Sequence, residues 1–67
     1  MDPRRVRLQL RIVRAAMQAA RPAERDGMAL RANEILDKMA FEIESDPDPA
    51  LTRLLAEVRS EVEGTRG

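Results

Sequence analysis

Arginines are the residues with the clearest chemical potential in this sequence of 67 amino acids. Near the N-terminus they recur every three or four positions, which is the spacing that lines one face of a helix. Guanidinium groups bind both phosphate and carboxylate. The candidate contacts for a nucleic acid or an acidic partner are therefore Arg4, Arg5, Arg7, Arg11 and Arg14.

Side chains for catalysis are scarce. The sequence contains no Cys, His or Tyr, so its Ser and Thr hydroxyls have no imidazole base to activate them. The single lysine, Lys38, stands four residues after Glu34, the spacing of a surface ion pair on a helix. We therefore predict a non-enzymatic protein with no catalytic residue and no cofactor.

Four carboxylates, Glu42, Glu44, Asp46 and Asp48, surround two prolines. A calcium loop requires a central glycine and a bidentate Glu at a fixed position, and this segment has neither. Di-metal helical bundles require Glu-x-x-His pairs. We expect a solvated turn with capping aspartates here, and no metal site.

The net charge of zero conceals an uneven distribution. Residues 1–25 carry seven Arg against two acidic groups, a balance of +5, and residues 26–67 carry five basic against ten acidic groups, a balance of −5. A basic segment of this kind is typical of a nucleic-acid or acidic-partner surface. Alternatively, the basic segment packs beside the acidic helices of its own chain.

Proline and capping signals divide the chain into three helices. Asp2-Pro3 and Asp48-Pro49 are start signals, because an N-cap acceptor precedes proline at the first helical position. Pro22 is expected to end the first helix, Asp26 to cap the second and Gly64 to stop the third. The predicted fold is all-α, a helical hairpin plus a third helix in one domain, with helices at about 3–21, 27–45 and 49–63 and a tail at 64–67.

A strand is the alternative for the N-terminal segment. Val6, Leu8, Leu10 and Ile12 alternate with polar residues, as in a half-buried strand. A strand followed by two helices would resemble the ribbon-helix-helix DNA-binding fold, whose paired strands enter the major groove. No turn residue separates this segment from Val13–Met17, however, and β-branched residues are few, which favours a helix.

The apolar residues exceed what one packing face needs. The first helix has one line at Val6, Leu10, Val13, Met17 and Ala20 and a second at Leu8, Ile12, Ala15 and Ala19. The expected core face of the second helix is Met28, Ala32, Ile35, Leu36, Met39 and Ile43, with Leu30 and Phe41 together on its opposite side. The third helix has a single line at Leu51, Leu54, Leu55, Val58 and Val62.

This surplus predicts association, since exposed apolar patches mark interfaces and so small a domain is marginal alone. We expect a homodimeric bundle and a protein partner, with an interface formed by Leu8, Ile12, Ala15, Ala19, Leu30 and Phe41. Alternatively, Leu8, Ile12 and the alanines complete the core of a monomer.

The function predicted is a small regulatory or adaptor module that binds other proteins. The alternative is a dimeric nucleic-acid-binding regulator that uses the arginines. No apolar run has the length of a membrane span, and the N-terminus lacks the apolar core of a signal peptide. We therefore expect no membrane partner and a cytoplasmic location.

Overall fold

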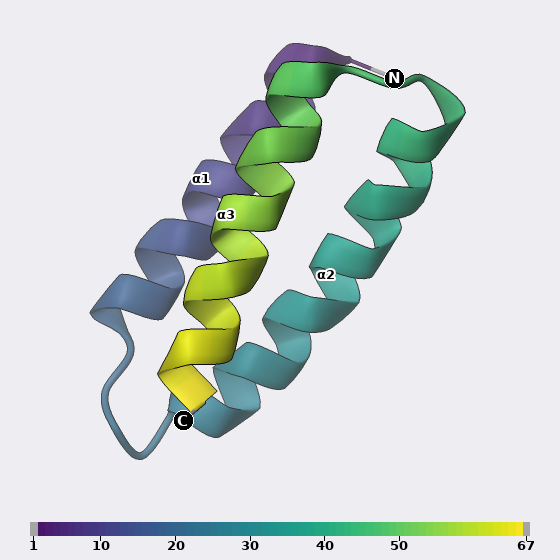
Figure 1. Ribbon diagram of the computed structural model, residues 1–67. Coiled ribbons are helices and arrows are strands. Elements are labelled where there is room, and N and C mark those ends of the chain that lie inside the picture. The colour runs from purple at the N-terminus through teal and green to yellow at the C-terminus, as the bar shows by residue number, and fades with distance from the viewer. Residues whose placement is uncertain (1, 67) are drawn as a thin grey trace.

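The computed structural model describes residues 2–66, with backbone only at 65 and 66. It is all-α, with three helices: α1 (Pro3–Ala19), α2 (Arg25–Ser45) and α3 (Pro49–Arg66). α1 and α3 run in one direction and α2 in the other (Figure 1). The predicted three-helix fold is confirmed. The strand alternative is wrong, because Val6 to Ile12 lie within α1.

α1 begins as predicted and ends earlier than predicted. An Asp2 side-chain oxygen accepts from the backbone N–H of Arg4 at 3.0 Å, and Pro3 takes the first helical position. The helix was expected to reach Arg21 but ends at Ala19, where Ala20 adopts an extended backbone as the C-cap. Proline disfavours a helical conformation in the residue before it. Pro22 therefore excludes Arg21 from the helix, and α1 ends before that residue.

α2 begins two residues before the predicted Gly27. A turn over residues 22–24, in which the Glu24 N–H donates to the Arg21 carbonyl at 2.9 Å, leads directly into the helix. Glu24 is the N-cap without a side-chain capping bond, and Asp26 lies in the first turn, so the prediction that Asp26 caps this helix is wrong. A carboxylate in the first turn still interacts favourably with the helix dipole.

α3 begins as predicted and extends further than predicted. The Asp48 carboxylate accepts from the N–H groups of Ala50 and Leu51 at 2.9 and 3.3 Å. Gly64 does not stop the helix, which continues to Arg66, so the predicted tail at 64–66 is helical. Gly64 has no positive φ, and a glycine ends a helix by adopting that left-handed conformation. Gly67 lies outside the described residues.

The core is formed where α3 packs against both other helices. α3 contacts α1 and α2 extensively, whereas α1 and α2 contact each other much less (Figure 1). The first apolar line of α1 is buried, as predicted. On α2, Ala29 is buried although it was not predicted, and Ile35 is 37% exposed although it was expected in the core. The buried core residues are Val6, Leu10, Val13, Met17, Ala20, Ala29, Ala32, Leu36, Met39, Ile43, Leu51, Val58 and Val62.

Candidate functional site: a groove between α1 and α2

A groove runs between α1 and α2, where these two helices make few contacts. It consists of three adjoining hollows of about 410, 320 and 180 Å³. The first and second share Gln9 and Glu42, and the second and third share Ile12, Val13 and Ile35. The hollows therefore form one continuous surface, which we call the α1/α2 groove.

The second and third hollows of the groove are mainly apolar. Core residues such as Val13 and Met39 line its floor, and Ile12 and Ile35 form its walls. These two isoleucines are 58% and 37% exposed. The groove is thus bounded by large aliphatic side chains that the monomer leaves in water, although burial of such a side chain is worth roughly 1.5–3 kcal/mol.

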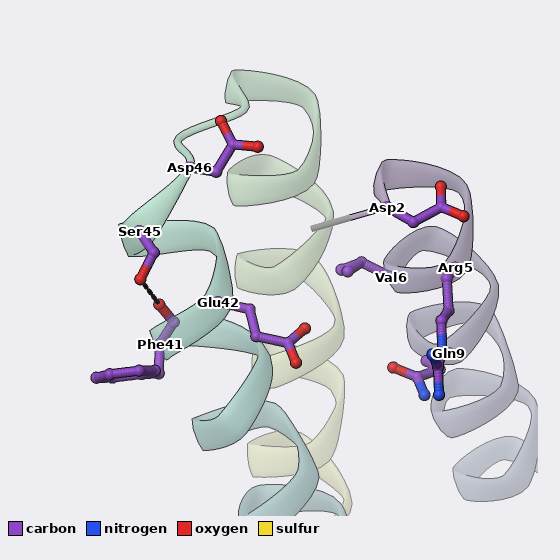
Figure 2. A pocket seen from close by; sticks show the side chains of 8 residues that line it. All are labelled: Asp2, Arg5, Val6, Gln9, Phe41, Glu42, Ser45 and Asp46. Carbon is purple, nitrogen blue, oxygen red and sulfur yellow. Dashed lines mark hydrogen bonds between the residues drawn. The ribbon is translucent and has the colours of Figure 1, made fainter.

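The end of the groove near the start of α1 is polar. The N-cap residue Asp2 and, from α1, Arg5 and Gln9 line it, and Glu42 extends from α2 toward them (Figure 2). The Ser45 hydroxyl donates to the carbonyl of Phe41 at 3.2 Å, a bond within its own helix rather than to a base. This end can therefore make ion pairs and hydrogen bonds with a bound chain.

The second apolar line of α1 continues outward from the groove. Leu8 is 59% exposed, and Ala15 and Ala19 are also exposed. The alternative in which Leu8, Ile12 and the alanines complete the monomer core is therefore wrong, except that Ala20 is buried. Only the apolar line that begins at Val6 is packed in the core, because α2 and α3 cover only that side of α1.

Leu30 and Phe41 are both exposed, at 59% and 72%, but they do not form one patch. Eleven residues of helix separate them by about 16 Å, and the exposed Glu34 and Asp37 lie between them on that side of α2. The Phe41 ring points away from α1 (Figure 2). The prediction that these two side chains lie together is wrong, because a shared direction on a helix does not bring side chains three turns apart into contact.

The structure divides the predicted arginine contacts into three groups. Arg4, Arg7 and Arg11 are exposed on the outer side of α1, and Arg5 lines the groove. Arg14 is half-buried and forms an ion pair with Glu61 of α3, with 3.0 Å from Nε to Oε2. One of the five arginines thus pairs with an acidic helix of its own chain.

Of the α2 residues that line the groove, only Phe41 was predicted at an interface. Met28, Arg31, Ile35, Lys38, Glu42 and Ser45 all line the groove. Their steps of three and four residues were visible in the sequence as a helical line. The polar members hid it, because only its apolar residues were counted and these were assigned to the core face.

In comparisons with known protein families, with curated proteins and with solved structures, the chain matches none. None of the three described helices is long and apolar enough to cross a bilayer. Within residues 2–66, no three carboxylates come together in an arrangement that would hold a metal ion.

Proposed function

We propose that this protein is a non-enzymatic interaction module of the regulatory or adaptor type, which acts by self-association and by binding a protein partner through the α1/α2 groove. The observation that carries the proposal is the exposure of Ile12 and Ile35 along a continuous, largely apolar groove. Amphipathic helices bind in grooves of this kind by inserting side chains at steps of three and four residues.

The balance of burial supports the same proposal. A three-helix domain of this size has little free energy to spare, yet Leu8, Ile12 and Ile35 stay accessible on adjoining surfaces of α1 and α2. Covering them by association would add apolar burial that the isolated fold lacks. A contiguous apolar surface that is exposed to solvent is typical of an interface.

Light scattering over a range of protein concentrations tests the proposal. We expect the mass to rise from the 7.6 kDa of one chain toward twice that value as concentration increases. A mass that stays at one chain into the millimolar range, with no binding of amphipathic helical peptides, would refute it.

A second candidate is nucleic-acid binding, which the outer side of α1 favours. Arg4, Arg7 and Arg11 are exposed at helical spacing, and neither ion pair found among the described side chains involves them. Each phosphate contact makes the slope of log binding constant against log salt concentration more negative by about 0.9. Three contacts per copy predict a slope of about −3 in a gel-shift titration, and no shift at low salt would eliminate this candidate.

A further inference from the structure

We infer that the α1/α2 groove is covered by a second copy of this chain, packed across a two-fold axis so that each α2 lies antiparallel to its counterpart and each α1 does the same. This inference rests on the proposed self-association. It adds the partner's orientation and the residue pairs that fix it.

The groove-lining residues of α2 are complementary to themselves in an antiparallel arrangement. Arg31 lines the third hollow, Glu42 lines the first and second, and Ile35 and Lys38 lie between them along α2. A two-fold axis midway between Ile35 and Lys38 places Arg31 of each copy opposite Glu42 of the other. The same axis lays each Lys38 stem over the other copy's Ile35, a contact in which lysine covers apolar surface and keeps its charge in water.

α1 fits the same axis. Ile12 shares a hollow with Ile35 and Lys38. It therefore lies at the same level along the groove as the point midway between those two residues. An axis through Ile12 brings the two Ile12 side chains together and sets Leu8 of one copy near Ala16 of the other. Small residues on that side of α1, among them Ala15 and Ala19, allow the two helices to approach closely.

The available area is consistent with a reversible dimer. The molecule measures 36 × 16 × 15 Å between Cα atoms, so one long face offers roughly 600 Å² a copy, against about 800 Å² in a standard stable interface. We therefore expect association that depends on concentration rather than a permanent dimer.

A foreign helix is the less favoured occupant. It would need acidic residues near Arg31 and basic residues near Glu42, and a second copy supplies this pattern without any further requirement. An isologous contact of this kind is also the commonest form of association between identical chains.

Charge reversal tests the arrangement by sedimentation equilibrium. In a dimer of Arg31→Glu, both contacts between positions 31 and 42 join two acidic side chains. In a dimer of Glu42→Arg, both join two basic side chains. Each variant alone should therefore raise the dimer dissociation constant at least tenfold. An equimolar mixture of the two variants restores both opposite-charge pairs. It should form a heterodimer within about threefold of the wild-type constant, as should the double variant with itself.

The control is Glu44→Arg, a charge reversal at an exposed position that lines no part of the groove. It should leave the constant unchanged, and circular dichroism should show equal helix content in all variants. If wild type dimerises but the mixture does not recover, the antiparallel pairing is wrong while the proposed function stands. If wild type remains monomeric, this inference fails, and the proposed function then stands only if the groove binds an amphipathic helical peptide.

Discussion

Ile12 and Leu30 form a matched pair for testing which surface associates. Their exposed fractions are 58% and 59%, and each sits on a helix away from its core face. Ile12 lines the α1/α2 groove, whereas Leu30 does not. Replacing either by Gln preserves a residue of reasonable helix propensity, so the two variants should differ in association and not in folding.

The expected magnitude follows from the exposure of Ile12. Full burial of an isoleucine side chain contributes roughly 1.5–3 kcal/mol, and slightly more than half of Ile12 remains to be buried, which is about 1 kcal/mol per copy. Two copies meet in the dimer, so Ile12→Gln should cost about 2 kcal/mol, or about 30-fold in the dissociation constant. Leu30→Gln should change the constant less than twofold.

Sedimentation equilibrium of wild type and both variants measures these constants, and thermal unfolding checks the fold. Equal weakening by both substitutions would show that exposure alone, and not position in the groove, governs association. Weakening by Leu30→Gln alone would move the interface to the outer side of α2 and refute the reasoning. A loss of helix in Ile12→Gln would mean that this side chain belongs to the core.

Three further predictions concern the fold that holds the groove. Asp48→Ala removes the two capping bonds of α3 and should lower the free energy of unfolding by about 1 kcal/mol in urea denaturation. The control is Asp46→Ala, which should cost much less because the Asp46 side chain caps no helix. Equal costs would contradict the capping role. Gly64→Ala should raise the melting temperature, because Gly64 is helical with open space around it and alanine is favoured there by up to about 1 kcal/mol; a fall would indicate the left-handed helix stop that the sequence suggested. Asn33→Leu should raise the free energy of unfolding by about 1 kcal/mol in the same urea assay, since the Asn33 Oδ1 is buried and accepts no hydrogen bond from the described protein groups. A decrease would show that the amide makes a stabilising contact.

Most of the fold could be predicted because its signals are local. Aspartate followed by proline marks the starts of α1 and α3, and steps of three and four residues mark the buried faces. The start of α2 could not be predicted in this way. A turn hydrogen bond at Glu24 leads into the helix without a side-chain cap, so the more usual capping residue, Asp26, gave a misleading signal.

The site was less predictable because it depends on how the helices sit against one another. Leu8 and Ile12 were identified as surplus to the core, and the structure leaves both exposed. Which side of α2 faces the same groove follows from the position of α3, and no local pattern specifies that. Ile35 and Leu36 are both branched aliphatic residues in one helical run, and sequence alone assigned both to the core.

The one-residue step from Ile35 to Leu36 separates association from stability within a single helix. Leu36 is fully buried, whereas Ile35 is 37% exposed on the groove wall. Adjacent residues on a helix point about 100° apart, so α3 can cover one and leave the other to a second chain. Because Leu36 belongs to the core and Ile35 to the groove wall, changes at Leu36 should act mainly through folding and changes at Ile35 mainly through binding. The side chains of the groove wall can therefore vary while the core that positions them is preserved.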